Sequence, residues 1–252
     1  MAISIKSPQE IEYMREAGRL LALVHQTMAQ ELKPGMSTYQ IDKIGEEAIR
    51  SFKCIPSFLN YNGFPASICI SVNDVIIHGI PSKKQFVKEG DIVSLDAGLI
   101  YHGYHADAAR TLAVGEISEE AKKLIEATER SFFEGIKFAV AGGFLHDISA
   151  GVENYIRPFG YGIVREYTGH GVGSHLHEDP AIPNYKPIGR GPKLRAGMTL
   201  AVEPMINIGT HRIKQLDDGW TVKTADGSLS AHYENTILIT DGEPEILTLL
   251  KA

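Results

Sequence analysis

The N-terminal part of the chain carries an amphipathic pattern that predicts a long helix. Ser7, Pro8 and Glu10 form a helix start, because serine can cap the first turn, proline suits it and Glu10 can reach back to the N–H of the cap. Apolar positions then recur three and four residues apart, at Ile11, Met14, Gly18, Leu21 and Val24. We therefore expect a helix with one stripe packed against a core.

The rest of the chain alternates between helical and β-like patterns. Further helices are expected over residues 38–52, 118–140 and 146–156. Apolar runs predict strands over residues 66–72, 91–96, 103–113, 198–208, 219–224 and 236–240. Helix pairs that alternate with antiparallel runs joined by short glycine turns indicate an α+β fold rather than a parallel doubly wound sheet.

A faint internal repeat suggests how the chain is organised. One copy runs from His78 to Asp96 and the other from His177 to Glu203, and each begins with H-x-x-P and ends an apolar strand with an acid six residues beyond a glycine. Halves related by a pseudo-twofold axis would bring both acids and both histidines to one centre. We predict a single domain over residues 1–252 made of two related halves, approximately 1–115 and 116–252. The Pro/Gly-rich stretch 183–192 is then a loop inside it.

Composition narrows the class of protein. The chain has 252 residues, 43% of them hydrophobic, with 25 Lys+Arg against 31 Asp+Glu and a formal charge of -6. No apolar run approaches the ~18 residues of a membrane span, and no basic block suits a protein that coats nucleic acid. Residues 1–6 lack the features of a secretory signal, so we expect a cytoplasmic protein. With only Cys54 and Cys69, any metal must be held by His, Asp and Glu.

Four carboxylates accompany apolar strands, where a lone charge costs several kcal/mol unless it is paired or bound to metal. Asp96 ends the run Ile92–Leu95, and Asp107 lies eleven residues further on, across a glycine-bounded turn. Glu203 and Glu234 are the other two. In the simplest alternative, Asp107 pairs with Arg110 and Asp96 caps a turn.

His170 adds an imidazole to this set. It lies between glycines in Thr168–Gly173, which leaves the ring open to a ligand. Four carboxylates and one imidazole, without a matching set of buried Lys or Arg, suit two divalent ions and disfavour soft or copper-type sites. Four negative charges and one bridging hydroxide against two such ions leave about -1, close to the neutrality that a buried site requires.

Taken in order, these motifs resemble those of the type I methionine aminopeptidases. The matching segments are D-A-A-R-T around Asp107, G-H-G-V-G around His170, H-E-D-P from His177, V-E-P around Glu203 and E-N-T from Glu234. Residues 220–231 are similar to the stretch typical of the type I branch, and the short gap before Glu234 leaves no room for the type II insertion. The start of the chain resembles the compact bacterial form. The resemblance implies the "pita-bread" fold, a central antiparallel sheet covered by two helix pairs.

The resemblance also implies a dinuclear metal centre. Asp107 and Glu234 would bridge two divalent metals, Asp96 would complete one site, and His170 and Glu203 would complete the other. Cobalt, manganese, iron and zinc all suit such a donor set, so the metal stays open.

Three residues are implied to act on the substrate. Glu203 would carry a proton from the nucleophile to the leaving amine, His177 would donate to the developing oxyanion, and His78 would contact the amide nitrogen beyond the cleaved bond. Arg110 would hold a ligand carboxylate from outside the site.

An apolar pocket for methionine is implied as well, lined by Tyr61, Phe64, Cys69, Leu176 and Trp220. Phe64 stands where the family commonly has Tyr and Leu176 where it commonly has Phe, which leaves the size of the pocket open. Cys69 fits equally well as a plain core residue. A structural monovalent cation is implied at carbonyls of Asn73, Val75 and Ser230.

The remaining histidines have simpler interpretations. His102 and His105, three residues apart in an extended segment, should point to opposite faces. His175 could share the face of His177, and only the motif register chooses between them. Surface or hydrogen-bonded side chains are expected at His25, His146, His211 and His232.

The implied function is removal of the initiator methionine from nascent proteins whose second residue is small. The expected partners are nascent N-terminal peptides and the ribosome exit region, and the chain is expected to be a monomeric enzyme. Since it begins Met1-Ala2, it should also process itself. The alternatives are an X-Pro-type aminopeptidase of the same fold and a non-catalytic peptide-binding relative.

Overall fold

The computed structural model describes residues 3–250, so the predicted processing site at Met1-Ala2 lies outside the described residues. Its four α-helices are α1 (Pro8–Glu31), α2 (Thr38–Ser51), α3 (Glu119–Ile136) and α4 (Leu145–Ile156). There are also two short 3-10 helices in this part of the chain, η1 (Tyr61–Gly63) and η2 (Arg157–Phe159). No helix in the described part of the chain is long and apolar enough to cross a membrane.

Local capping explains where the helices begin. The Ser7 hydroxyl accepts from the backbone N–H of Glu10, whose carboxylate accepts in return from the N–H of Ser7. Ser37 and Gln40 form the same box at the start of α2. The predicted starts of both helices are therefore confirmed.

The third helix ends earlier than predicted, at Ile136 rather than near Val140. Beyond Ile136 the chain turns inward, and the backbone N–H groups of Ala141 and Gly142 donate to the carbonyls of Thr240 and Leu194 instead of continuing the helix. Bonds to distant segments override the local helical pattern here.

The strands form one large sheet and two small ones. The strands are β1 (Ile55–Pro56), β2 (Ile68–Val72), β3 (Val75–Ile77), β4 (Ile92–Tyr101), β5 (Tyr104–Ala113), β6 (Gly162–Ile163), β7 (Gly169–Gly171), β8 (Glu178–Ile182), β9 (Thr199–Val202), β10 (Met205–Asn207), β11 (Ile213–Gln215), β12 (Val222–Thr224), β13 (Ser230–His232), β14 (Glu234–Leu238) and β15 (Glu245–Ile246). The nine-stranded sheet has the order β1-β4-β5-β14-β9-β7-β8, with β2 on β4 and β15 on β14. The others are β13-β10-β6 and β11-β12-β3. The described pairings are antiparallel, which confirms the predicted class.

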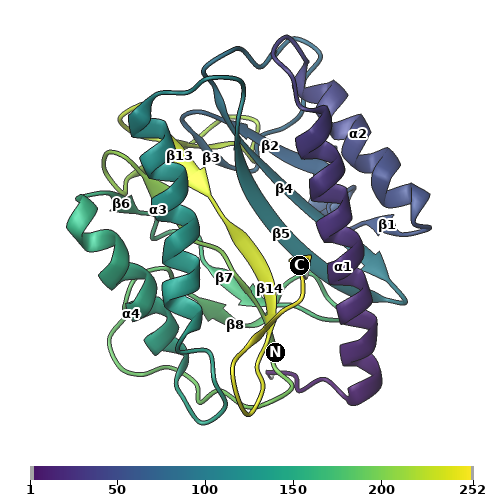
Figure 1. The fold of residues 1–252 in the computed structure, drawn as a ribbon, viewed down its shortest axis with the longest axis vertical. Coiled ribbons are helices and arrows are strands. Elements are labelled where there is room, and N and C mark those ends of the chain that lie inside the picture. The colour runs from purple at the N-terminus through teal and green to yellow at the C-terminus, as the bar shows by residue number, and fades with distance from the viewer. Residues whose placement is uncertain (1–2, 251–252) are drawn as a thin grey trace.

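Two helix pairs flank the strands. Helices α1 and α2 pack on β4, β5 and β2, whereas α3 and α4 pack on each other and α3 reaches β10 and β13. Figure 1 shows the pairs on opposite sides of the view, with β5 and β14 between them. This arrangement is the predicted pita-bread fold.

Asp96 does not end its strand, contrary to the prediction. Strand β4 continues to Tyr101 and turns at His102 and Gly103, and Gly98 lets it pass close to Ser57 and Phe58. In the register of the hairpin, Asp96 pairs with Ala109 and Gly98 pairs with Asp107. The two acids are diagonal neighbours on one face of the sheet, so the expected proximity holds although the turn lies elsewhere.

The strand predicted over residues 198–208 is two strands in different sheets. Pro204 has no N–H for a ladder, and β9 ends just before Glu203 while β10 begins at Met205. The partner segment changes sheets at the same level, where the N–H of Tyr233 donates to the carbonyl of Pro204. Glu203 and Glu234 therefore lie where the large sheet passes into a small one.

Candidate metal centre

Five neighbouring strands each supply one residue to a buried cluster. The strand order β4-β5-β14-β9-β7 carries, in turn, Asp96, Asp107, Glu234, Glu203 directly after β9, and His170. The register aligns them across the strands, because Ala109 pairs with both Asp96 and Glu234, and Ala201 pairs with His170. Residues spread over more than half of the sequence thus meet in one row.

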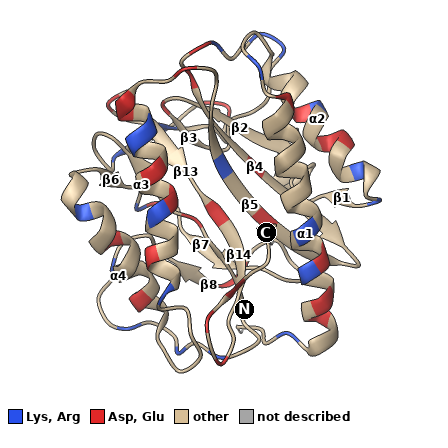
Figure 2. Cartoon of the chain, in the orientation of Figure 1, with Lys and Arg blue, Asp and Glu red and all other residues tan. Residues whose placement is uncertain are grey.

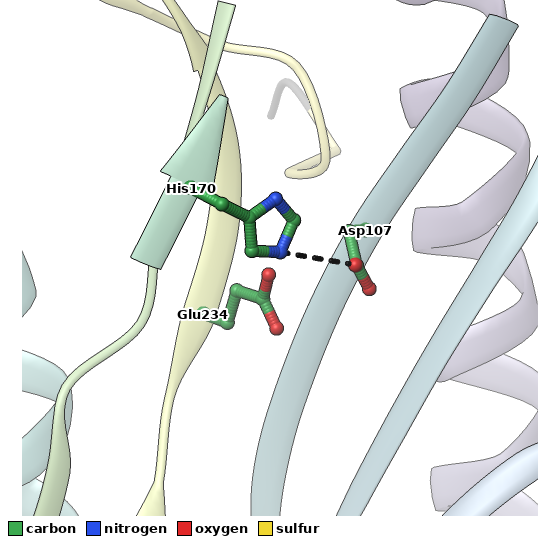
Figure 3. Close-up of side chains that lie close together, drawn as sticks. All are labelled: Asp107, His170 and Glu234. Atoms are coloured by element: carbon green, nitrogen blue, oxygen red, sulfur yellow. Dashed lines mark ion pairs between the residues drawn. The ribbon is translucent and has the colours of Figure 1, made fainter. Parts of the chain in front are cut away.

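The distances within the cluster suit a shared cation. The Nε2 atom of His170 lies 3.5 Å from Oε1 of Glu203 and 3.7 Å from Oδ2 of Asp107. Ligand atoms of Asp107, His170 and Glu234 all lie within 4.8 Å of one another, and Figure 3 shows the three side chains converging from separate strands. This geometry provides a metal-binding group.

The orientation of His170 is fixed by its backbone. Its Nδ1 atom lies 2.8 Å from the carbonyl oxygen of Gly171, to which it can only donate. Nε2 then carries the lone pair and faces the carboxylates. Metal-binding histidines are commonly oriented in this way.

Burial makes the carboxylates hard to ionise on their own. Loss of solvation raises the pKa of Asp107 to about 7 and raises those of Asp96, Glu203 and Glu234 well above their usual range, with further increases from the neighbouring acids. One oxygen each of Asp96, Asp107 and Glu234 has no hydrogen-bond partner among the described residues. In Figure 2, acidic segments of β5 and β14 lie in the centre of the fold, whereas most other charges lie on helices and loops. An oxygen-rich set of this kind fits hard or borderline divalent ions.

Arg110 does not neutralise the cluster. Its guanidinium donates to the backbone carbonyls of Ala109, Glu234 and Thr248 and to the side chain of Asn235. Three residues along a strand from Asp107, it points to the opposite face of the sheet. The alternative that Asp107 pairs with Arg110 is therefore wrong, and so is the expectation that Arg110 holds a ligand carboxylate. It holds the backbone behind the cluster instead.

A cavity of about 340 Å³ opens onto the cluster and contains both histidines proposed to act on the substrate, His78 and His177. All five predicted pocket residues line it: Tyr61, Phe64, Cys69, Leu176 and Trp220. Sequence reasoning missed further lining residues: Phe58, Asn62, Ile77, Glu166, Tyr167 and Thr168. Tyr167 and Thr168 directly precede the G-H-G segment, and their position next to this motif could have indicated that they line the site.

The apolar end of the cavity is a small packed cluster. Phe64, Cys69 and Leu176 are almost fully buried, and the Phe64 ring meets the ring of Trp220 edge-on at 5.1 Å. Cys69 lines the cavity and packs in this cluster at once, so its two interpretations are compatible. Burial raises the pKa of the Cys69 thiol well above its usual value, so it stays neutral.

The two cavity histidines are held differently. His78 has a left-handed backbone (φ 58) and sits edge-on against Tyr167 and Trp220. Gly79 follows because a Cβ there would lie 2.1 Å from the carbonyl oxygen of Ile70. His177 is exposed to the cavity, and its Nδ1 lies 2.8 Å from the hydroxyl of Tyr61. Tyr61 therefore has a polar contact as well as an apolar one.

The other histidines lie outside the cavity. His102 lies in the β4–β5 turn, His105 bonds the hydroxyl of Ser57, and His175 lies near the hydroxyl of Ser174. His25 is buried with its Nε2 atom 2.9 Å from a backbone carbonyl oxygen, as expected of a satisfied core side chain.

The expectation for His232 is wrong. Its side chain is 2% exposed, and neither ring nitrogen has a hydrogen-bond partner among the described residues. Nε2 lies 3.8 Å from a carboxylate oxygen of Glu203 and 3.8 Å from one of Glu234. The residue faces the cluster because β13 runs directly into β14, a contact that local sequence does not show.

The segments predicted to hold a monovalent cation come together where β3 contacts β13. The N–H of Ser230 donates to the carbonyl of Asn73, and Val75 pairs with Lys223 on β12. The Asn73 side chain is already bonded to Asp91 and to the N–H of Ile92. Backbone carbonyls are therefore the groups that these residues could offer to a cation.

The fold and the cluster together define a metal-dependent hydrolase, and similarity to known proteins specifies which group. Residues 12–241 match metallopeptidase family M24. A methionine aminopeptidase of Clostridium acetobutylicum is 54% identical over 98% of this chain and 99% of its own. The chain belongs to metallopeptidase family M24, and membership in this family implies that the cluster binds divalent metal.

Solved structures agree with this assignment. The crystal structure of a methionine aminopeptidase from Thermotoga maritima superposes with a TM-score of 0.96 and 42% identity, covering 98% of this chain and 100% of that one. A Xaa-Pro dipeptidase from Bacillus anthracis shares the fold at a TM-score of 0.79 and 25% identity, but this chain covers only 62% of it.

Proposed function

We propose that this enzyme is a methionine aminopeptidase that removes the N-terminal initiator methionine from proteins whose second residue is small. The observation that carries the proposal is a cavity in which the five candidate ligands lie beside an apolar pocket, three of them close enough together to share one metal ion. Relatives that match this chain over nearly their whole length are named for the same activity. Substrates are therefore N-terminal peptides.

The ligand roles that we propose are those implied by the family resemblance. Asp107 and Glu234, from adjacent strands, would bridge two divalent ions, Asp96 would complete one site, and His170 and Glu203 would complete the other. When bound, such ions lower the pKa of a water molecule and polarise the scissile carbonyl. Cobalt, manganese, iron and zinc each suit these donors.

Protein groups supply the proton transfers. Glu203 has one oxygen toward His170 and the other toward His232, so the second oxygen can take and return a proton beside the cluster. Burial raises the pKa of Tyr61 and lowers that of His177, which favours the neutral form of both side chains. We assign the tyrosine O–H as the donor to Nδ1 of the imidazole, which corresponds to the Nε2–H tautomer. Nε2 of His177 then bears the proton and donates to the developing oxyanion. His78 contacts the next amide nitrogen.

Selectivity for methionine is assigned to the apolar cluster around Phe64, Cys69 and Leu176, closed by Tyr61 and Trp220. These side chains offer one unbranched thioether an apolar wall and an aromatic edge, which are contacts that sulfur favours. The charged N-terminal amine of the peptide would lie toward the carboxylates.

Several finer properties belong to the same proposal. The two helix pairs and the repeated His-to-acid segments support a catalytic domain built of two related halves, 1–115 and 116–252. We further propose that the enzyme is a cytoplasmic monomer that acts near the ribosome exit region. A monovalent cation held by carbonyls of Asn73, Val75 and Ser230 would brace β3 against β13.

The test is a metal-reconstituted assay on Met-Ala-Ser and on an Ala-Pro peptide, with and without chelator. We expect the enzyme to cleave Met-Ala-Ser and the chelator to abolish this cleavage. Cleavage of the proline peptide alone would indicate the X-Pro alternative, and binding without turnover would indicate a non-catalytic relative. A His177→Ala variant should keep its metals and lose most turnover. Loss of metal in that variant would contradict the assignment of His177.

A further inference from the structure

One buried imidazole next to the cluster has no part in the function described so far. His232 is 2% exposed, and both of its ring nitrogens lack a hydrogen-bond partner among the described residues. A buried polar group left without a partner destabilises the folded protein, because it has lost its bonds to water and gained none. We therefore look for a hydrogen-bond partner of His232 within the metal-binding cluster.

The backbone sets where His232 points. The hydroxyl of Thr111 donates to the carbonyl of His232 and accepts from its N–H, so a single side chain on β5 anchors both backbone groups. On the other side, Met205 pairs with His232 in the small sheet. The ring is therefore held at the junction of two sheets and has little freedom to turn away.

The ring faces the two glutamates of the cluster. Its Nε2 atom lies 3.8 Å from Oε2 of Glu203 and 3.8 Å from Oε2 of Glu234. His170 approaches Glu203 from its other oxygen, Oε1, at 3.5 Å. The carboxylate of Glu203 thus lies between two imidazoles.

The two imidazoles differ in what their second nitrogen does. Nδ1 of His170 donates to a backbone carbonyl, which leaves Nε2 as a lone-pair ligand. Nδ1 of His232 has no such bond in the described structure. A neutral imidazole has one N–H to donate, on either ring nitrogen. Nothing prevents that N–H from lying on Nε2, toward the carboxylates.

We propose that His232 is a positioning residue of the metal centre: its Nε2–H donates to the carboxylates of Glu203 and Glu234, directly or through one water, and fixes the oxygens that face away from His170. The role in catalysis rests on the proposed function, whereas the placement of His232 follows from the distances above. A distance of 3.8 Å is about 1 Å longer than a direct hydrogen bond, so a small side-chain shift or one bridging water completes the contact. A held carboxylate binds metal better and keeps its second oxygen aligned for proton transfer.

The experiment compares two substitutions at one position. His232→Gln keeps an N–H donor, whereas His232→Leu removes it. Metal affinity and stoichiometry are measured by titration calorimetry with Mn²⁺, and the ligand set is followed by the visible spectrum of the Co²⁺-loaded protein. His105→Leu is the control, because His105 is a histidine of the large sheet, on β5, that bonds Ser57 outside the cavity. Melting of the metal-free variants establishes that each one folds.

The leucine variant is expected to lose about 10- to 100-fold in metal affinity, the usual effect of removing a group that orients a ligand. The glutamine variant is expected to recover most of that loss, with a Co²⁺ spectrum like that of the parent enzyme. With Met-Ala-Ser as substrate, His232→Leu should lower kcat more than it raises KM. The control should match the parent in all three measurements.

Two outcomes would overturn the inference. Equal loss of metal in both variants, with an altered Co²⁺ spectrum, would make His232 a direct ligand. Unchanged metal affinity in both would make it a packing residue. Failure of the parent enzyme to cleave Met-Ala-Ser would refute the proposed function but leave the metal titrations as an independent test of His232.

Discussion

Arg110 offers the clearest test of how the back of the metal centre is held. Its half-buried guanidinium donates to three backbone carbonyls, on Ala109, Glu234 and Thr248, and to the side chain of Asn235. It also lies 4.6 Å from the centre of the Tyr233 ring. A single side chain therefore ties β5 to β14 and to the C-terminal segment.

Replacing Arg110 with methionine keeps the aliphatic stem and removes all of these donors. A hydrogen bond to a charged group contributes about 1.5–3 kcal/mol, but the guanidinium also costs free energy to desolvate, so we expect a net loss of about 3 kcal/mol. For a chain of this length, that loss lowers Tm by about 6 °C. Affinity for Mn²⁺ should fall as well, because the backbone of Glu234 loses its support.

Thermal unfolding of the metal-free protein, followed by circular dichroism, measures the effect. Arg19→Met is the matched control, since the ion pair of Arg19 within residues 3–250 is with Glu16, on the exposed face of α1. It should change the free energy of unfolding by less than about 1 kcal/mol. Arg110→Lys should rescue only part of the loss, because one ammonium cannot reach acceptors in several directions. A Tm for Arg110→Met within about 1 °C of the parent would refute the reasoning.

Three further predictions follow from other contacts. Gly171→Ala should prevent folding or abolish metal binding, since the new Cβ would lie 2.3 Å from the carbonyl oxygen of Asp179, whereas Gly242→Ala meets nothing closer than 4.0 Å and should melt like the parent. Tyr61→Phe should lower kcat about 10-fold with metal affinity unchanged, because the tautomer of His177 is no longer fixed; an unchanged kcat in steady-state assays would contradict this. Burial, with a smaller effect of the Arg110 charge, lowers the pKa of His25 to about 3, so the unfolded chain alone binds this proton between about pH 6.5 and 3 and stability falls as the pH falls through that window. In urea unfolding at pH 7, 6 and 5, His25→Gln should therefore lose less stability than the parent, by an amount that approaches about 1.4 kcal/mol per pH unit below pH 6.5, and parallel losses would count against it.

Local features of the chain could be predicted from the sequence without knowledge of the fold. The starts of the first two helices follow from capping boxes that close within three residues, at Ser7 and Ser37. The sequence identified the candidate carboxylate ligands because an unpaired charge on an apolar strand costs free energy wherever the strand lies in the fold. Motif order then implied the family, the cavity histidines and the pocket.

Misreadings arose where distant segments meet. The helix expected to reach residue 140 ends at Ile136, and the backbone after residue 140 bonds to the carbonyls of Leu194 and Thr240 in distant loops. The local sequence predicts a strand end at Asp96, although β4 continues through Gly98 and pairs with β1. In both cases the contacting segments are far apart in the sequence, so the residues near Ile136 and Asp96 do not indicate these contacts.

By itself, then, the sequence determined which elements form and which chemistry they can carry, since caps, periodicity and the cost of unpaired charge are local properties. Only the tertiary structure decided which side chains share the centre. The register of five strands aligns the ligands, the bonds from Arg110 to the backbone of Glu234 hold it behind the cluster, and the passage of β13 into β14 places His232 against Glu203 and Glu234. Such placement depends on long-range pairing, in which a shift of one residue sends every side chain to the opposite face.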